Sequence, residues 1–263
     1  MKVMNTFKSS KRIVIKIGSS LLTNRKGNVN KNVLKNVVSD ISTLLKKNKE
    51  IILVSSGAIS LGKGKLKLNK KLSLNESQAV AATGQIELMS SWQKEFCKHN
   101  IVVAQLLLSP SDAENKKSST NAIATIENLL NFKCMPIINE NDTTSTDEIK
   151  FGDNDILAAQ IARLIKADHL ILLSNVDGLY KEPPLNNKEG VLISEVKSIT
   201  NNIHAMAGTA SKLGKGGMIS KIKAAEICMK SNCSVIITSG QKQNPIMSLS
   251  KISTKATRFS ARK

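Results

Sequence analysis

The segment RIVIKIGSS (residues 12–20) joins a run of branched apolar residues to a glycine-containing turn. The run from Ile13 to Ile17 predicts a strand that is buried on both faces, as strands of parallel sheets are. Lys16 interrupts this run, and a buried lysine is costly unless it is paired. At the carboxyl end of a strand its amine can emerge into a ligand cleft, so we expect Lys16 to be functional.

Beyond this segment, apolar runs of strand length alternate with longer segments of helical periodicity. We expect strands at 12–18, 50–57, 101–108, 134–139, 169–175 and 234–240, and a short strand or hairpin at 190–194. We expect helices at 30–47, 76–99, 119–131, 153–167 and 216–231. This alternation predicts an α/β protein with a mainly parallel sheet and helices on both faces, folded as one compact domain of one or two lobes.

Composition excludes several classes of protein. The chain has 263 residues, of which 41% are hydrophobic, and this is typical of a folded globular chain. Neither a membrane span nor the apolar core of a secretory signal is present, so we expect a cytoplasmic protein. The cysteines (97, 134, 228 and 233) form no CxxC pair and the histidines are scattered, so reduced thiols are expected and a protein-ligated metal is not.

The net charge of +19 invites a nucleic-acid partner. Most of the positive residues are lysines, whereas base readout relies on arginine, and aromatic residues make up 3% of the chain. Lysine-rich solvated faces are therefore the favoured interpretation, and no specific nucleic acid is expected. Contact with nucleic acid stays an alternative.

Small and polar residues follow several predicted strands. Ser55–Ala58, Asn139–Asp142 and Ser174–Gly178 each stand where a strand ends. In parallel sheets, ligands bind beyond these carboxyl ends, and glycine lets backbone N–H groups approach a phosphate. The pattern predicts a site for a phosphorylated ligand and a small zwitterion.

Two segments resemble phosphate-binding loops. GAISLGK (57–63) matches the start of a Walker A motif, but Gly64 stands where Ser or Thr is needed, so a P-loop is a weak alternative. GKGGMISK (214–221) enters a predicted helix, whose N–H groups and dipole favour an anion, with Lys221 one turn inside. The ordinary alternative for this second segment is a flexible loop with a solvated lysine.

Acidic and amide residues form a third candidate at GDND (152–155). Such residues often only cap a helix, but three in a row exceed what one cap needs. Asp155 could hold two lysines in place, Asn154 could bond a carboxylate, and Asp142 could accept bonds from an ammonium group.

Five blocks of sequence, in this order, closely resemble the glutamate 5-kinases of the amino acid kinase family. They are IVIKIGSSLLT (13–23), LVSSGAISLG (53–62), INENDTTSTDEIKFGDNDILAA (138–159), LLSNVDGLY (172–180) and GKGGMISKIKAA (214–225). The resemblance covers residues 12–258 and implies a three-layer α/β/α sandwich. It also implies ATP-dependent phosphorylation of the L-glutamate side-chain carboxylate to L-glutamyl 5-phosphate, the first step of proline biosynthesis.

The resemblance assigns roles to individual residues. Lys16 and Lys221 would flank the transferred phosphoryl group and Asp155 would organise them. Glutamate would be bound by Ser56, Asp142 and Asn154. ATP would be bound by Lys16, Gly18, Gly57, Ser174, Asn175, Lys215, Gly216, Gly217, Met218, Ile219, Ser220 and Lys221. Mg²⁺ would be held mainly through the ATP phosphates.

This sequence departs from the family at two places. Ser174-Asn175 stands where Thr-Asp is frequent, and Lys215 where Thr is frequent, which affects nucleotide binding more than chemistry. We expect an extension at 1–11, a kinase domain at 12–258, a basic tail at 259–263 and no PUA domain. A homo-oligomer, either a dimer or a tetramer, and hand-off of the product to glutamyl phosphate reductase are further expectations.

Glutamate's carboxylate is already ionised at neutral pH, so in-line transfer needs no general base. We expect the loop 143–152 to close and exclude water. The alternatives are another amino acid kinase (N-acetylglutamate kinase, aspartokinase or uridylate kinase), a basic RNA-binding protein with an idle kinase fold, and an amino-acid sensor.

Overall fold

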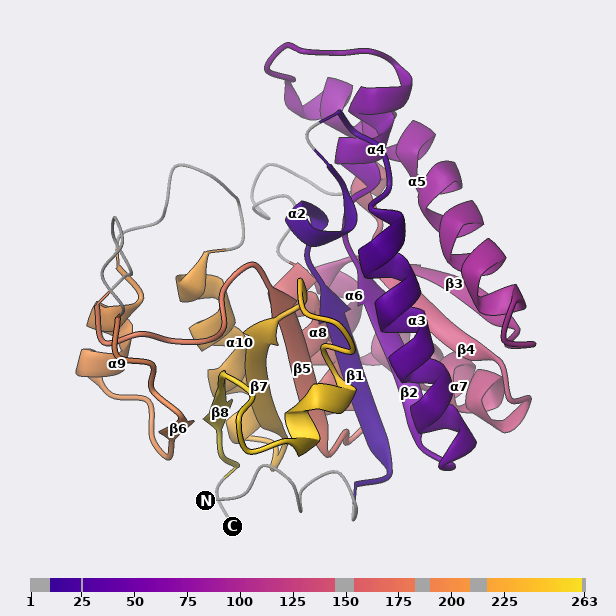
Figure 1. The fold of residues 1–263 in the computed structure, drawn as a ribbon. Coiled ribbons are helices and arrows are strands. Elements are labelled where there is room, and N and C mark those ends of the chain that lie inside the picture. Colours follow the sequence, from indigo (N-terminus) through magenta and orange to yellow (C-terminus); the bar gives the residue numbers. More distant parts are fainter. Residues whose placement is uncertain (1–9, 25, 145–153, 183–189, 209–216, 262–263) are drawn as a thin grey trace.

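The computed structural model describes residues 10–24, 26–144, 154–182, 190–208 and 217–261. Its centre is one eight-stranded sheet with the strand order β3-β4-β2-β1-β5-β7-β8-β6 (Figure 1). The strands are β1 (Arg12–Ile17), β2 (Glu50–Ser55), β3 (Val103–Leu108), β4 (Met135–Glu140), β5 (His169–Ser174), β6 (Glu195–Val196), β7 (Ser234–Ser239) and β8 (Ala256–Phe259). All neighbouring strands are parallel except β7 and β8, which confirms the mainly parallel sheet.

Helices cover both faces of this sheet. They are α2 (Ser19–Leu22), α3 (Lys31–Lys46), α4 (Ala58–Lys65), α5 (Leu74–Cys97), α6 (Pro110–Glu114), α7 (Lys116–Asn131), α8 (Asn154–Leu164), α9 (Asn201–Met206) and α10 (Met218–Met229). Two short 3-10 helices, η2 (Asp142–Thr144) and η3 (Met247–Ser250), follow β4 and β7. None of the helices in the described ranges is both long and apolar enough to cross a membrane.

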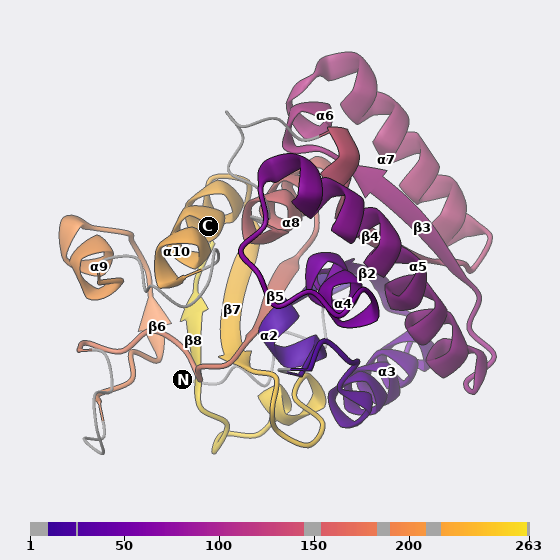
Figure 2. The ribbon, with the colours of Figure 1, turned by 90° about the horizontal axis from the view of Figure 1, so that it is seen from above.

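The alternation of side chains along β1 explains the three layers. Ile13, Ile15 and Ile17 are buried in one apolar cluster, which α3 and α5 share. Val14 belongs to a second cluster on the other face, built with α8 and α10. Because both faces are apolar, both must be covered, and the view from above shows helices on the two sides of the sheet (Figure 2). The three-layer α/β/α sandwich is thus confirmed.

Two glycines allow α4 and α5 to pack backbone against backbone. A Cβ atom on Gly84 would lie 1.9 Å from the carbonyl oxygen of Ala58, and one on Gly62 would lie 1.9 Å from that of Val80. No side chain fits at either distance, so glycine is required at both positions. This close contact holds the middle of α5 beside the start of α4, near the carboxyl ends of the strands.

The structure adds elements that the sequence pattern does not predict. Residues 57–63 form the start of α4 rather than a phosphate loop, because the helix already begins at Ala58 and contains Gly62 and Lys63. The segment 190–194, expected as a short strand or hairpin, pairs antiparallel with residues 179–181 through an isolated bridge between Tyr180 and Leu192, which agrees with the hairpin. Strand β8 extends one residue past the expected domain boundary at 258, and its last residue, Phe259, is fully buried.

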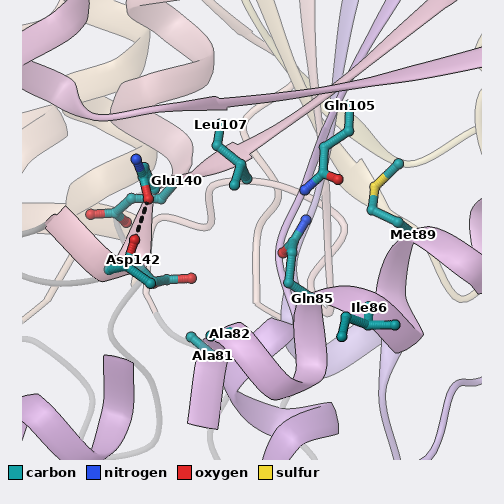
Figure 3. A pocket seen from close by; sticks show the side chains of 11 residues that line it. Ala81, Ala82, Gln85, Ile86, Met89, Gln105, Leu107, Glu140 and Asp142 are labelled. Carbon is teal, nitrogen blue, oxygen red and sulfur yellow. Dashed lines mark hydrogen bonds between the residues drawn. The ribbon is translucent and has the colours of Figure 1, made fainter. Parts of the chain in front are cut away.

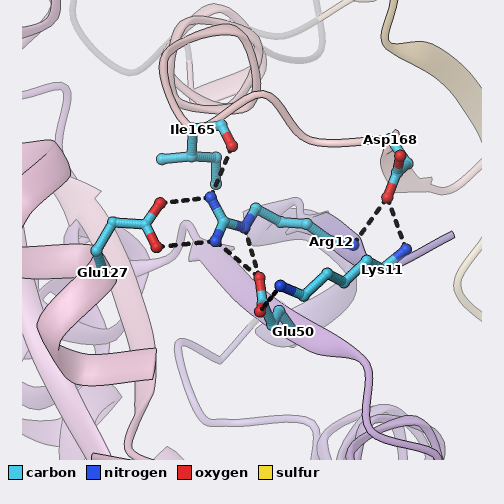
Figure 4. Close-up of polar contacts among 6 residues, drawn as sticks. All are labelled: Lys11, Arg12, Glu50, Glu127, Ile165 and Asp168. Carbon is cyan, nitrogen blue, oxygen red and sulfur yellow. Dashed lines mark hydrogen bonds and ion pairs between the residues drawn. The ribbon is translucent and has the colours of Figure 1, made fainter. Parts of the chain in front are cut away.

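A charged cluster lies at the opposite end of the sheet, at the amino-terminal ends of the parallel strands (Figure 4). The guanidinium of Arg12 donates to Glu127 on α7, to Glu50 on β2 (2.7 Å) and to the carbonyl oxygen of Ile165 (2.8 Å). The carboxylate of Asp168 accepts hydrogen bonds from the main-chain N–H groups of Arg12 and its neighbour Lys11. This cluster joins β1, β2 and α7 to the residues between α8 and β5, far from the predicted site. The four cysteines are all free thiols.

Candidate active site

One carboxylate joins the two lysines that the sequence singles out. Asp155, the second residue of α8, is fully buried. Its Oδ1 lies 2.7 Å from Nζ of Lys16, near the end of β1, and its Oδ2 lies 3.0 Å from Nζ of Lys221, in the first turn of α10. Both lysines are themselves buried, with exposed fractions of 7% and 5%. The structure therefore brings together three candidates from three distant parts of the chain.

The charges of this cluster keep Asp155 ionised. Burial alone would raise the pKa of its carboxyl group, but the positive charges of Lys16 and Lys221 outweigh burial and hold that pKa well below its usual range. A hydrogen bond from the hydroxyl of Ser220 (2.7 Å) acts in the same direction. Two ammonium groups and one carboxylate leave a net positive charge, which is suited to an anionic ligand.

Helix α10 aims its N-terminus at the same place. Gly217 is its N-cap, and Met218 and Ile219 form its first turn with Ser220. The hydroxyl of Ser220 also donates to the carbonyl oxygen of Gly217 (3.0 Å). The unpaired N–H groups of a helix start attract phosphate, so an anion placed there would meet both Lys221 and the helix start. Lys215 and Gly216, also predicted to bind ATP, lie outside the described residues.

The predicted nucleotide-binding residues of β1 and β5 lie beside one another. A Cβ atom on Gly18 would lie 3.8 Å from Nζ of Lys16, so the strand-to-helix turn covers the lysine amine. Ser174 ends β5, the neighbour of β1, and Asn175 follows it. The side-chain amide of Asn175 donates to the hydroxyl of Ser20 (2.8 Å), which ties this position to α2.

The predicted glutamate-binding residues Ser56 and Asn154 are in direct contact. The Nδ2 of Asn154 donates both to Oγ of Ser56 (2.8 Å) and to Oδ1 of Asn139 (3.0 Å). Its Oδ1 is buried and accepts no hydrogen bond from the part of the chain that the structure describes. The sequence suggests that Asn154 bonds a carboxylate, but its N–H groups are engaged here. Its free atom is an acceptor, which suits an ammonium group.

Asp142 stands further along the same edge. It begins η2 just after β4, and it lines a cavity of about 250 Å³ together with Gln85, Leu107 and Glu140 (Figure 3). Apolar side chains of α5, among them Met89, complete the wall. The structure thus places Asp142 on the α5 side of the asparagines, whereas the two lysines lie on the α8 side.

Two residues of the site receive no individual role from the sequence. Asn139 is 3% exposed and links Asn154 to α5 by donating from Nδ2 to Oε1 of Gln85 (2.7 Å). Asn139 belongs to the strand-end group Asn139–Asp142 that the sequence already indicates, without a role of its own. Gln85 gives no such signal, since it occupies a helix whose polar residues look like an ordinary solvated face.

The arrangement can neutralise and position two anions. A phosphoryl group placed against Lys16, Lys221 and the start of α10 would face concentrated positive charge. Among the described residues, no three His, Cys, Asp or Glu side chains lie together as metal ligands. Glycine at position 57 has a φ of 120°, which permits the abrupt turn from β2 into α4 next to Ser56.

Comparison with known proteins identifies the relatives of this chain. Residues 11–239 match the amino acid kinase family. A glutamate 5-kinase from Paramagnetospirillum magneticum is 44% identical over 94% of this chain, which spans 67% of that relative. A glutamate 5-kinase from Clostridium acetobutylicum is 45% identical over 94% of each chain.

Two solved structures share the fold. A UMP kinase from Ureaplasma parvum superposes with a TM-score of 0.67 at 16% identity, covering 95% of this chain and 99% of its own. A carbamate kinase from Giardia lamblia bound to AMP-PNP gives a TM-score of 0.63 at 18% identity, covering 97% and 99%. At these identities the likeness concerns the arrangement of helices and strands alone.

Proposed function

The chain belongs to the amino acid kinase family and, within it, to the glutamate 5-kinases, and from this premise we propose how its site works. The reaction transfers the γ-phosphoryl group of ATP to the side-chain carboxylate of L-glutamate and gives L-glutamyl 5-phosphate and ADP. This product starts the biosynthesis of proline. The observation that carries the mechanism is the buried Asp155 carboxylate with a lysine on each of its oxygens.

Catalysis in this proposal consists of positioning and charge neutralisation. The attacking carboxylate has a pKa of about 4.3 and is ionised at neutral pH, so it needs no general base. It approaches the γ-phosphorus in line, opposite the departing ADP oxygen. Lys16 and Lys221 offset the repulsion between the two anions, and Asp155 keeps both amines at fixed places.

The substrates would occupy adjoining parts of the strand-end edge. Ser56, Asp142 and Asn154 hold glutamate. Gly18, Gly57, Ser174 and Asn175, the segment 215–221 and Lys16 hold ATP. Mg²⁺ would be held mainly through the phosphates of ATP, because the carboxylate of Asp155 is already engaged by two lysines. When bound, the ion supplies further positive charge at the phosphates. The segment 143–152, expected to close over the acyl phosphate, falls mainly outside the described residues.

The test is to trap the acyl phosphate with hydroxylamine in the presence of ATP and Mg²⁺, because hydroxylamine converts it to a stable hydroxamate. L-Glutamate, N-acetylglutamate and aspartate are offered in parallel. Hydroxamate from L-glutamate alone is expected. Hydroxamate from another acid would show that the chain acts on a different substrate. If a folded, ATP-binding protein formed no hydroxamate from any of the acids, kinase activity would be contradicted.

Three wider expectations belong to the same proposal. The reaction takes place in the cytoplasm, in keeping with four free thiols. The enzyme works as a homo-oligomer, either a dimer or a tetramer. Its unstable product passes to glutamyl phosphate reductase, since an acyl phosphate hydrolyses readily in water.

A further inference from the structure

Four polar side chains form a directional chain of hydrogen bonds that begins on α5 and ends at the predicted glutamate site. Oε1 of Gln85 accepts from Nδ2 of Asn139 (2.7 Å), and Oδ1 of Asn139 accepts from Nδ2 of Asn154 (3.0 Å). Nδ2 of Asn154 also donates to Oγ of Ser56 (2.8 Å). With Gln85 presenting Oε1, Asn139 and Asn154 each have one orientation that satisfies their neighbours, whereas Nε2 of Gln85 is buried and has no partner among the described residues.

The orientation of Asn139 depends on Gln85. A carboxamide carries an acceptor on one side and a donor on the other. If Asn139 turned over, its Nδ2 would face Nδ2 of Asn154, and two donors would meet inside a buried site. Gln85 prevents this, because its Oε1 offers Asn139 Nδ2 an acceptor.

The orientation of Asn154 follows in turn. With both donor contacts on one side, its Oδ1 points away from Ser56 and Asn139, and it accepts no bond from the described residues. Asn154 is 5% exposed, so this is a buried acceptor held in place without a partner. Such an atom is costly unless a ligand satisfies it, and the α-ammonium group of glutamate is a matching donor.

We propose that Gln85 is a positioning residue for substrate recognition: through Asn139 it fixes Asn154 Oδ1 as the acceptor for the α-ammonium group of glutamate. This inference rests on the proposed function. It assigns selectivity for an amino acid, over a simple dicarboxylic acid, partly to a residue of α5 that lies outside every sequence block resembling the family.

The test compares L-glutamate with glutarate, which has both carboxylates but no ammonium group. The KM for glutamate and the inhibition constant of glutarate are measured in the hydroxamate assay. Gln85→Met keeps the length of the side chain and removes both polar atoms. We expect the glutamate KM to rise about tenfold, while the glutarate constant changes by less than about twofold.

Two further variants separate positioning from packing. Gln85→Glu keeps an acceptor for Asn139, and its charge repels both dicarboxylates alike, so the ratio of the two constants is expected within about twofold of wild type. Gln93→Met is the matched control, since Gln93 is exposed on the same helix, and it should change neither constant.

The outcomes are distinct. Equal increases for glutamate and glutarate in Gln85→Met would assign Gln85 a structural role and overturn the inference, as would unchanged constants. A ratio in Gln85→Glu as high as in Gln85→Met would overturn the role of the acceptor. If the wild-type protein makes no glutamyl hydroxamate, the proposed function itself is overturned. The outcomes for the Gln85 variants are compared with an active wild type, so the two failures can be distinguished.

Discussion

Nζ of Lys16 lies 2.7 Å from Oδ1 of Asp155, although one residue belongs to the first strand and the other to a helix that follows the fourth. The second oxygen of the same carboxylate is bound by Lys221 (3.0 Å). The carboxylate thus fixes the distance between two amines. This relationship links the stability of the fold to the chemistry of the site, and the first two predictions follow from it.

Removal of the Lys221 amine should slow the chemical step. In Lys221→Ala we expect kcat to fall by about 10²–10³-fold, because a preorganised positive group next to the transferred phosphoryl is lost. Steady-state rates at saturating ATP and glutamate measure the effect. Lys223→Ala, an exposed neighbour on α10, should keep the wild-type rate. Unchanged turnover in Lys221→Ala would refute its assigned role, and Lys16→Ala is expected to behave like Lys221→Ala.

Neutralising Asp155 should destabilise the protein in a pH-dependent way. Asp155→Asn leaves two buried ammonium groups without a counter-charge, so the free energy of unfolding should fall by about 3 kcal/mol at pH 7. The pKa of Asp155 is lower in the folded protein than its ordinary value of 3.8. Its contribution is therefore fully present above that value and is lost as the pH falls below it.

Urea unfolding of wild type and Asp155→Asn at several pH values tests the direction of this pH dependence. The difference in free energy of unfolding between the two proteins should stay constant from pH 7 to about 5 and narrow only below about 4. A difference that already narrows between pH 7 and 6 would contradict a depressed pKa for this carboxyl group.

Asp142 should affect binding more than turnover. It lies away from the lysines, on the cavity beside α5, so Asp142→Ala is expected to raise the KM for glutamate by about tenfold or more. The kcat and the KM for ATP should change by less than about threefold. Glu87→Ala, which removes an exposed carboxylate of α5, serves as the control. A loss confined to kcat would place Asp142 in the chemistry instead.

The cluster around Arg12 should matter for stability alone. Its side chain is 16% exposed and bonds to two carboxylates and a carbonyl, so Arg12→Met should lower the free energy of unfolding by about 3 kcal/mol. The ion pair of Lys11 with Glu50 is 74% exposed on the lysine side, and Lys11→Ala should cost at most about 0.5 kcal/mol. Hydroxamate formation by both variants at 25 °C should match wild type, because the cluster lies at the far edge of the sheet.

Much of the fold could be predicted because its strands are continuous apolar runs. Val14 and Ile15 face opposite layers and both are fully buried, so the segment admits few other structures. Short elements were missed for a physical reason. Strand β8 (Ala256–Phe259) has two polar residues between Ala256 and Phe259 within a lysine-rich tail, so its own pattern gives no strand signal, and pairing with β7 makes it a strand.

Part of the site could be predicted, because two of its residues are unusual for the local structure in which they stand. Lys16 within an apolar strand and Asp155 at a helix start each stand out in the sequence, and the structure joins them. The orientation of Asn154 could not be predicted, because it depends on Asn139 and Gln85, which approach it only in the folded chain. Residue types fix which atoms are available, whereas tertiary contacts decide which of them remain unpaired.

The central position of β1 has a consequence for synthesis on the ribosome. β2 can pair with β1 soon after it emerges, but β5, on the other side, comes only after Asp155. Lys221 follows Asp155 by 66 residues. A nascent chain that has released β1 to β4 thus carries the amine of Lys16 without the carboxylate of Asp155. A chain that ends before α10 has Lys16 and Asp155 but still lacks Lys221. The cluster of Lys16, Asp155 and Lys221 is therefore completed late in translation, when only β7 and β8 of the eight strands have still to be made.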